Sequence, residues 1–461
     1  MAKYKAYPEY KDSAVEWLGK IPCHWKTISI SRLFSRTKRS GYTEKELLSV
    51  YRDYGVIPKS SRDDNNNKPS EDLSPYQLVQ PNDLVMNKMK AWQGSIAISE
   101  YEGIVSPAYF VYQPNKILFD LAHPKYVHYL LRNPIYVTQY LSRSKGIRVN
   151  QWDLDPDEFR NIELLLPDKI EQEKIYSFLD HETAKIDNLI EKQQQLIELL
   201  KEKRQAVISH AVTKGLNPDV PMKDSGIEWL GEVPEHWDVS YLKYVIANEK
   251  NAMVDGPFGS SVNTETDYVE QGIPVIRTVN ITNLGFSSEN LKFMRYEKYI
   301  QLKRHSVRPN DVLFSKVGTI GNACILPDSI PEAILSTTGS CKITLEQGSV
   351  IPEYLVYVIQ SMNEQLMQIA NSNVQPFLNM SNIRGLNIPL PKLDEQKDIL
   401  QAININLLKI DDLIDKASKF ELLLQERRTA LISAAVTGKI DVRDWVAPDT
   451  QDVEVPQEAT A

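Results

Sequence analysis

Three short clusters of basic side chains are the first groups in this sequence that could do chemistry. They comprise Arg36, Lys38 and Arg39, then Arg143, Lys145 and Arg148, and finally Lys303, Arg304 and Arg308. Guanidinium and ammonium groups at this spacing can bind the phosphate oxygens of a nucleic acid. Basic residues that only keep a protein surface soluble form similar clusters, however. The whole chain also carries a net charge of −8. Charge alone therefore does not predict a protein that coats nucleic acid.

Motifs for catalysis and metal binding are missing from the sequence. It contains no Gly-x-x-x-x-Gly-Lys-Ser/Thr or Gly-x-Gly-x-x-Gly phosphate loop, no Ser-His-Asp signature and no Asn/Asp-Pro-Pro-Tyr/Phe motif of amino-methyltransferases. Cys23, Cys324 and Cys341 are too few and too scattered for a disulfide framework or a zinc site. His24 and His236 occupy matching places beside tryptophans, which favours packed structural residues over metal ligands. We expect a recognition protein with no catalytic residue, no metal site and no cofactor of its own.

An internal repeat sets the organisation of the chain. Lys11–Trp25 and Lys223–Trp237 are identical at ten of fifteen positions. Pro167–Thr213 and Pro391–Thr437 are identical at 20 of 47 positions, without a gap. The chain is therefore a tandem duplication of one unit.

The segments between these repeated blocks diverge almost completely. One short similarity remains. Pro-Asn-Asp-Leu at 81–84 and Pro-Asn-Asp-Val at 309–312 are each followed by a lysine at the same distance, Lys88 and Lys316. Similar frames around dissimilar middles predict a fixed scaffold that presents two different specificities. An old duplication that drifted freely would also preserve the core-forming segments, and it remains the alternative.

Each copy ends in a long helix. The stretch from Lys169 to Val212 has no Gly or Pro and is dominated by strong helix formers. About 40 helical residues give a rod of roughly 60 Å, which cannot bury an apolar stripe by itself. The equivalent helix of the other copy is the expected partner, in an antiparallel coiled coil. Packing of each helix on its own globular domain is the alternative.

Heptad positions predict which side chains join the two helices. The expected interface consists of Ile186, Leu189, Leu196, Leu200, Ile410, Leu413, Phe420 and Leu424. The globular middles show strand-like patches at 96–98, 109–112, 273–277, 311–314 and 333–336. Helix-like patches lie at 123–140 and 352–369. These patterns predict a mixed α+β fold.

The repeated motifs resemble a known family. Trp-Leu-Gly-x-Ile/Val-Pro-x-His-Trp occurs at Trp17–Trp25 and Trp229–Trp237, and each globular segment closes with Leu-Pro, Glu-Gln and a helix ending in Ile-Ser-x-Ala-Val-Thr. Apart from its acidic tail, the whole chain resembles the DNA-specificity subunit of type I restriction-modification systems. Asp255–Ser261, Gly272–Arg277 and Gln375–Asn379 are further family-like pieces.

The resemblance implies two α/β target-recognition domains separated by a pair of long antiparallel coiled-coil helices, with an internal pseudo-twofold repeat. The expected boundaries are 1–166 for the first domain, 167–216 for the central helix, 217–390 for the second domain, 391–445 for the distal helix and 446–461 for an acidic disordered tail. Each domain would read one half of a bipartite, asymmetric target in double-stranded DNA, and the helices would set the spacer.

The resemblance also implies partners. Two modification (methyltransferase) subunits and two restriction (motor and nuclease) subunits would join this chain, and S-adenosylmethionine, ATP and Mg²⁺ would bind to those subunits. Adenine would leave the base stack to be methylated in the pocket of the partner. The holoenzyme would be a site-specific DNA endonuclease and adenine-N6 methyltransferase.

Within that family, the base-reading residues are nominated by hydrogen-bonding geometry. Arg pairs in a bidentate manner with guanine, and Asn or Gln with adenine. The nominated residues are Lys88, Lys145, Arg148, Asn150 and Gln151 in the first domain, and Ser260, Arg277, Asn280, Lys316, Gln375 and Asn379 in the second. Lys88 is included because it matches Lys316.

Two rival functions remain open at this stage. The first is a coiled-coil scaffold that joins two protein-binding modules without DNA specificity, and the second is a single-chain restriction enzyme, which the missing motifs disfavour. No apolar run approaches the roughly 18–20 residues that cross a bilayer, and the first residues lack the apolar stretch of a secretory signal. We therefore expect a cytoplasmic protein without a membrane partner.

Overall fold

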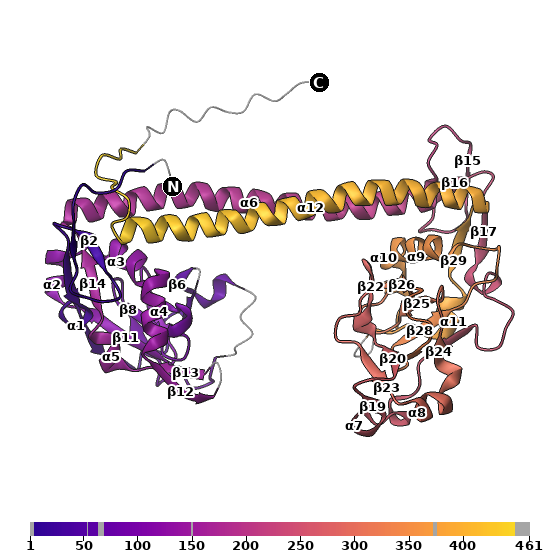
Figure 1. Cartoon of the computed structure of the whole chain (residues 1–461), viewed down its shortest axis with the longest axis horizontal. Coiled ribbons are helices and arrows are strands. Elements are labelled where there is room, and N and C mark those ends of the chain that lie inside the picture. Colours follow the sequence, from indigo (N-terminus) through magenta and orange to yellow (C-terminus); the bar gives the residue numbers. More distant parts are fainter. Residues whose placement is uncertain (1–3, 53, 63–68, 149–150, 372–375, 448–461) are drawn as a thin grey trace. The chain divides into compact units, whose positions relative to one another are not determined.

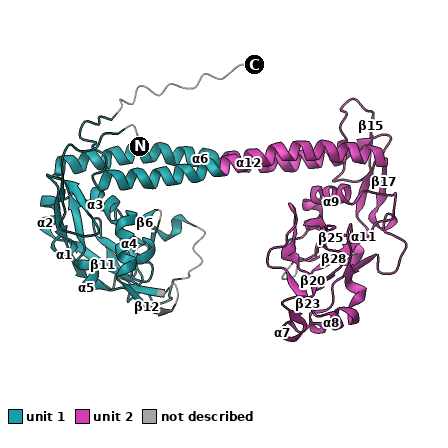
Figure 2. Ribbon diagram, in the orientation of Figure 1, with its two compact units in different colours: residues 1–194, 419–461 teal, residues 195–418 magenta. Residues whose placement is uncertain are grey.

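The computed structural model describes residues 4–52, 54–62, 69–148, 151–371 and 376–447. It divides into two compact units, residues 1–194 with 419–461 and residues 195–418 (Figure 2). Each unit combines one globular domain with one half of each of two long helices, so the helices belong to both units. The predicted acidic tail lies outside the described residues from position 448 onward.

The globular part of unit 1 is built on a four-stranded antiparallel sheet in the order β4-β11-β8-β9, of which Figure 1 labels β8 and β11. Its strands are β4 Phe34–Thr37, β8 Leu84–Asn87, β9 Ile96–Ile98 and β11 Tyr109–Pro114. The patches predicted at 96–98 and 109–112 are therefore strands of one sheet. Strand β8 is central, and its Leu84, Val85 and Met86 are completely buried.

Shorter elements surround this sheet. The paired strands are β1 Tyr10–Asp12 with β2 Lys20–Pro22, β3 Lys26–Ser29 with β14 Glu163–Leu166, β5 Leu48–Tyr51 with β6 Gly55–Pro58, β7 Gln77–Val79 with β10 Gly103–Val105, and β12 Ser144–Arg148 with β13 Gln151–Leu154. The helices are α1 Ile30–Leu33, α2 Lys116–Leu121, α3 Pro124–Leu131, α4 Pro134–Ser142 and α5 Pro156–Arg160, with the 3-10 turns η1 Lys59–Ser61 and η2 Ala91–Gln93.

Unit 2 repeats the four-stranded sheet and adds a larger one. The order β18-β28-β25-β26 reproduces β4-β11-β8-β9, and all its pairs are antiparallel. Its strands are β18 Met253–Asp255, β25 Val312–Ser315, β26 Ala323–Ile325 and β28 Ser340–Ile343. The two domains thus share one topological frame although their sequences diverge.

The second sheet of unit 2 has five strands in the order β19-β23-β20-β27-β24. They are β19 Tyr268–Val269, β20 Ile273–Ile276, β23 Lys292–Met294, β24 Ser306–Val307 and β27 Ala333–Leu335. Strands β20 and β27, both predicted, pair in parallel, whereas the other strand pairs in the described part of the chain are antiparallel. The mixed α+β fold expected from the sequence is confirmed.

The remaining elements of unit 2 are short. The paired strands are β15 Met222–Asp224 with β16 Glu232–Pro234, β17 Asp238–Tyr241 with β29 Asn387–Leu390, and β21 Ile281–Thr282 with β22 Gly285–Phe286. The helices are α7 Thr264–Asp267, α8 Tyr296–Gln301, α9 Pro352–Ser361, α10 Asn363–Ile369 and α11 Met380–Arg384, with the turns η3 Leu242–Tyr244, η4 Gly259–Ser261, η5 Thr278–Asn280 and η6 Lys303–His305.

The patches predicted as single helices at 123–140 and 352–369 are each two helices. In unit 1 the break falls at Asn133, whose side chain accepts a 2.9 Å hydrogen bond from the amide of Ile135, with Pro134 at the first helical position. Pro134 has no amide proton and could not continue α3. In unit 2 the break lies at Met362, between α9 and α10.

The two long helices are α6 Lys169–Lys214 and α12 Leu393–Val436. In unit 1 they run antiparallel, because Asp187 pairs with Arg428 (Oδ1 to Nε, 2.7 Å) and, further along α6, Gln194 donates to Glu421 (2.7 Å). In unit 2, Arg204 pairs with Asp411 (Nε to Oδ1, 2.9 Å). This is the repeat equivalent of the pair in unit 1, so both halves of the helix pair share one register. The predicted pairing of the helices with each other is confirmed within each unit (Figure 2).

Half of the predicted helix interface is wrong by one residue. Ile186, Ile410 and Leu424 are at most 5% exposed and Leu200 is partly buried, as expected. Leu189, Leu196, Leu413 and Phe420 are 42–49% exposed. The second line of the seam contains the next residue instead, including the partly buried Ile190, Ile197 and Ile414. On a helix, positions three and four after a seam residue both lie near the seam, and the orientation of the partner helix selects between them.

The start of each long helix is fastened to its own domain by equivalent tryptophan and histidine contacts. In unit 1, the buried Glu171 accepts hydrogen bonds from Trp25 (3.1 Å) and Tyr7 (2.6 Å), and its second oxygen lies 2.7 Å from His24. In unit 2, Glu395 accepts from Trp237 (2.9 Å) and lies 2.9 Å from His236. The two histidines thus pair with structural carboxylates. The repeated tryptophan motif is the part of each domain that binds the start of the long helix.

A second residue pair completes each fastening. The side-chain amide of Gln172 donates to the carbonyl of Pro167 (2.8 Å) and accepts from the amide of His123 (2.8 Å). Gln396 makes the same bonds to Pro391 (2.9 Å) and Ile351 (2.9 Å). Both glutamines are completely buried. These contacts give a structural reason for the identity of the Glu-Gln pairs in the two copies.

The described residues contain no helix that is both long and apolar enough to cross a membrane. The three cysteines are unpaired: Cys23 is exposed, and burial raises the pKa of the Cys324 and Cys341 thiols to about 12.

Candidate nucleic-acid interface

The repeated Pro-Asn-Asp motif marks the same tight turn in both domains, directly before the central strand. Asn82 and Asn310 have positive φ angles of 72° and 67°, a conformation that asparagine tolerates better than most residues. The next residues, Asp83 and Asp311, are 2% and 1% exposed. The turn therefore enters β8 and β25 with one geometry in both copies.

The buried aspartates hold this turn together. Asp83 accepts from the amide of Gln80 (2.8 Å) and pairs with Arg39. Burial raises the pKa of Asp83, while the Gln80 amide and the Arg39 guanidinium oppose that shift. Asp311 accepts from the amide of Arg308 (2.9 Å) and from Lys342 (Nζ, 3.2 Å), and Thr344 also donates to it.

The lysines at the other end of the central strand also occupy equivalent places. The Lys88 carbonyl accepts from the amide of Leu154 (3.2 Å), and the Lys316 carbonyl accepts from the amide of Leu378 (3.0 Å). Leu154 ends the hairpin β12–β13, and Leu378 directly follows Phe377, which bridges to Val317. In each domain a variable segment thus docks at the exit of the central strand. Figure 1 shows β12 and β13 on the side of unit 1 away from α6 and α12.

The nominated residues of the first domain gather at this exit. Lys145 is exposed on β12, and Lys88 is partly buried at the end of β8. Arg148 and Gln151 are paired residues of β12 and β13, with side chains outside the described part. Asn150 itself lies outside the described residues.

Two nominations in the second domain are wrong as base readers. Asn280 is fully buried, and its side chain accepts from the amide of Arg277 (3.0 Å) and donates to the carbonyls of Ser287 (2.9 Å) and Glu289 (3.2 Å). Lys316 is 5% exposed and pairs with Asp255 (3.0 Å). Their hydrogen-bonding groups are used inside the domain. The amide of Asn280 stabilises the turn that follows Arg277, and the ammonium group of Lys316 pairs with Asp255 at the end of β18.

The other nominated residues of the second domain differ in exposure. Ser260 is exposed in the turn η4. Arg277 is partly buried and donates to the carbonyl of Asn290 (Nη2, 2.6 Å), so it also braces a turn. Asn379 is exposed but caps α11 by accepting from the amide of Asn382 (2.8 Å). Gln375 lies outside the described residues.

The basic clusters are partly consumed by contacts within the domains. Arg36 stacks on Phe110, with its guanidinium carbon 4.1 Å from the ring centroid. In the second cluster, Arg143 donates to the carbonyl of Gln139 (3.2 Å). In the third, Arg308 pairs with Glu249 (2.5 Å).

Sequence reasoning missed the aromatic side chains at the same exits. Trp92 follows β8 in η2, and Trp152 lies on β13; their ring centroids are 4.9 Å apart. In the second domain, Phe258 and Phe377 are 74% and 43% exposed and line one shallow hollow with Lys316 and Asn379. The sequence could have pointed to these aromatic residues through their separation along the chain from the repeated lysine and from the repeated C-terminal block. The sequences around them diverge between the copies, so this separation did not stand out.

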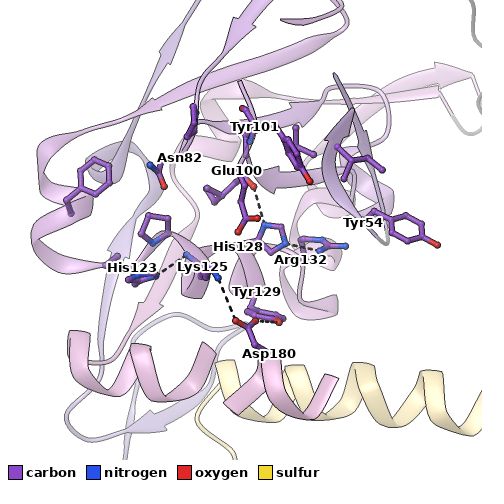
Figure 3. A pocket seen from close by; sticks show the side chains of 18 of the residues that line it. Tyr54, Asn82, Glu100, Tyr101, His123, Lys125, His128, Tyr129, Arg132 and Asp180 are labelled. Atoms are coloured by element: carbon purple, nitrogen blue, oxygen red, sulfur yellow. Dashed lines mark hydrogen bonds and ion pairs between the residues drawn. The ribbon is translucent and has the colours of Figure 1, made fainter. Parts of the chain in front are cut away.

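A cavity of about 760 Å³ lies between the domain of unit 1 and the long helices (Figure 3). Asp180 of α6 accepts from Tyr129 (2.7 Å) and lies 3.9 Å from Lys125, both on α3. Deeper in, Arg132 lies 2.9 Å from the ring nitrogen of His128, and burial, with help from Arg132, lowers the pKa of His128 to about 3. The Asp180 contacts fasten α3 to α6, and the low pKa leaves a neutral histidine in the lining of the cavity.

Comparisons with known proteins show which proteins this chain is similar to. Residues 257–414 match the family described as "Type I restriction modification DNA specificity domain". The chain is 24% identical over 440 residues to the Type I restriction enzyme MjaVIII specificity subunit of Methanocaldococcus jannaschii, covering 92% of this chain and 95% of that protein. The chain is therefore similar over nearly its whole length to type I restriction enzyme specificity subunits. The EcoKI specificity subunit of Escherichia coli K12 is 20% identical over 453 residues, 93% of this chain and 92% of that subunit.

The fold is also similar to that of a solved structure. A solved chain from work on complex assembly and conformational transition of the type I R-M system has a TM-score of 0.67 at 15% identity, covering 91% of this chain and 99% of that chain. The repeated tryptophan motif, the Glu-Gln fastening and the paired helices are the frame that the two copies in this chain share. The side chains at the exits of the central strands differ between the two copies.

Proposed function

We propose that this chain is the sequence-reading subunit of a type I restriction-modification complex, with one domain for each half of a bipartite, asymmetric target in double-stranded DNA. One observation carries the proposal. Two copies of one frame place divergent segments at the exit of the same central strand, at Lys88 and Lys316. Identical frames that carry different side chains suit the reading of two different half-sites.

Two equivalent partner sites are supported by the outer faces of the long helices. Leucines stay exposed at repeat-equivalent positions, Leu189 with Leu413 (43% and 49%) and Leu199 with Leu423 (62% and 59%). Leu196 and Phe420 follow the same rule at 42% and 46%. Apolar side chains exposed in line on a helix usually mark an interaction surface. Their duplication fits two copies of one partner, the modification subunit.

The chemistry of modification and cleavage belongs to the partners in this proposal. S-adenosylmethionine would bind to the two modification subunits, and ATP and Mg²⁺ to two restriction subunits. The role of this chain is to hold the complex on its target and to place an adenine of each half-site within reach of a modification subunit, where the base is flipped out of the stack. The complex would work in the cytoplasm, where the DNA is.

The test is methylation mapping. The chain is co-expressed with its modification subunit in a host without DNA methylation, and methylated adenines are located across the host genome. A single bipartite motif is expected, and exchange of residues 238–390 for those of a related chain should change one half of the motif only. Retention of both subunits in one complex without any methylated motif would favour the rival reading, a scaffold that joins protein-binding modules.

The helix pair offers a second test, of the spacer. Because α6 and α12 share one register, a heptad inserted after Gln194 and another after Phe420, at facing positions of the antiparallel pair, preserves the seam contacts on both sides. Seven residues lengthen the pair by roughly 10 Å, which corresponds to about three base pairs at roughly 3.4 Å each. The motif is expected to keep both halves and gain about three unspecified positions. An unchanged spacer would show that the helices do not set the distance.

A further inference from the structure

The tryptophans beside the Lys88 exit form a built surface rather than two isolated side chains. Trp92 and Trp152 lie 4.9 Å apart with their rings tilted by 60°, and both are partly buried. The indole Nε1 of Trp92 donates to the carbonyl of Met89 (3.0 Å). The hydrogen bond from the Leu154 N–H to the Lys88 carbonyl joins the hairpin β12–β13 to strand β8. The pair is therefore held in place before any ligand arrives.

The repeat shows that this surface is specific to the first domain. Counting from the Pro-Asn-Asp turn, the place of Trp92 is taken in the second domain by Ile320; counting from the repeated C-terminal block, the place of Trp152 is taken by Pro376. Ile320 is 7% exposed and belongs to the core of its domain. If the frame is common and the half-sites differ, side chains that differ at equivalent exits are the candidates for discrimination.

The chemistry around the pair suits a nucleic acid groove. Lys90 and Lys145 are exposed on neighbouring elements, Lys90 on the loop between β8 and Trp92 and Lys145 on β12, which pairs with the strand of Trp152. Met89, 40% exposed, adds an apolar side chain to the same loop. Lysines can contact phosphates, and apolar side chains in the major groove contact the C5-methyl group of thymine. A wedge between base pairs is less suitable, because each ring already covers part of the other.

We propose that Trp92 and Trp152 form an apolar platform that reads a thymine methyl group in the half-site of the first domain. The inference rests on the proposed DNA-reading function. It requires that this half-site contains a thymine whose methyl group contributes to binding. Burial of one methyl group contributes roughly 0.8 kcal/mol, so its removal should weaken binding about fourfold.

The test uses the complex of this chain with its modification subunits and duplexes that contain the mapped motif. Each thymine of either half-site is replaced in turn by uracil, which lacks only the methyl group. The native complex should bind about fourfold more weakly to one substituted duplex, at a position in the first half-site. Trp152→Ala and Trp92→Ala should bind the thymine and uracil duplexes equally at that position. Trp152→Phe, which keeps an apolar ring, should retain part of the difference.

A matched control comes from the second domain. Phe377→Ala removes an exposed aromatic side chain from the equivalent exit and should leave the thymine preference in the first half-site intact. Equal binding of all substituted duplexes by the native complex, or an unchanged preference in both tryptophan variants, would overturn the platform while the DNA-reading function stands. If the native complex shows no preference for any motif, the proposed function fails, and the platform fails with it.

Discussion

The seam of the long helices offers the sharpest test of the structure. Apolar residues one turn apart should differ strongly in how much their replacement by alanine lowers stability. Ile186 is 5% exposed between α6 and α12, whereas Leu189, one turn further on, is 43% exposed. Both side chains lose the same number of carbon atoms when they are replaced by alanine. Any difference between the two variants therefore reports burial rather than chemistry.

The expected magnitudes follow from that burial. Ile186→Ala removes three buried carbons and leaves a cavity between the helices, which costs about 2–5 kcal/mol. In a unit of this size, about 1 kcal/mol shifts the melting temperature by roughly 2–4 °C, so a decrease of about 4–20 °C is expected. Leu189→Ala should cost below about 1 kcal/mol, because much of that side chain already contacts water.

Thermal unfolding of the full chain, followed by circular dichroism at 222 nm, measures both variants. The repeat supplies an independent copy of the experiment, since Ile410→Ala and Leu413→Ala are the equivalent changes in unit 2 (5% and 49% exposed). Leu189→Ala and Leu413→Ala should instead weaken capture of the modification subunit. Equal destabilisation by Leu189→Ala and Ile186→Ala would refute the seam described here and restore the one expected from heptads alone.

Three further changes test other contacts. Asp311→Asn removes the charge that pairs with Lys342, which is 8% exposed at its side chain, and should destabilise unit 2 by about 3–5 kcal/mol; a urea midpoint equal to that of the native chain would contradict the pairing. Glu171→Gln should cost about 1–3 kcal/mol through the bonds from Trp25 and Tyr7, and should lower the melting temperature more than Glu395→Gln, whose site is more exposed. Because the pKa of His128 is lowered to about 3 from an ordinary value near 6.5, the unfolded chain binds a proton that the folded chain excludes. Stability is thus expected to fall as the pH drops below about 6.5 and to keep falling towards about 3, and His128→Gln should flatten this part of a stability curve measured in urea.

The organisation of the chain could be read from the sequence because duplication leaves a signal that needs no third dimension. Two matched blocks with few breaks predicted two domains and two long helices. The absence of Gly and Pro between Lys169 and Val212 predicted a helix over nearly its observed length. The tryptophan motif predicted a structural role for His24 and His236, which pair with Glu171 and Glu395. These features depend on local propensity and on identity between copies, both of which are written in the chain.

The side of each helix that faces its partner, and the residues available to DNA, were decided by tertiary structure. Leu189 and Ile190 are both apolar and adjacent, so the sequence could not say which of them lies at the seam. Asn280 and Lys316 have the chemistry of base readers, yet the turn at Arg277 and the carboxylate of Asp255 use their polar groups. Trp92 and Trp152 are 60 residues apart and meet because β13 docks on the end of β8. A residue type states what a side chain can bind, and packing determines whether that capacity is spent inside the fold or offered to a partner.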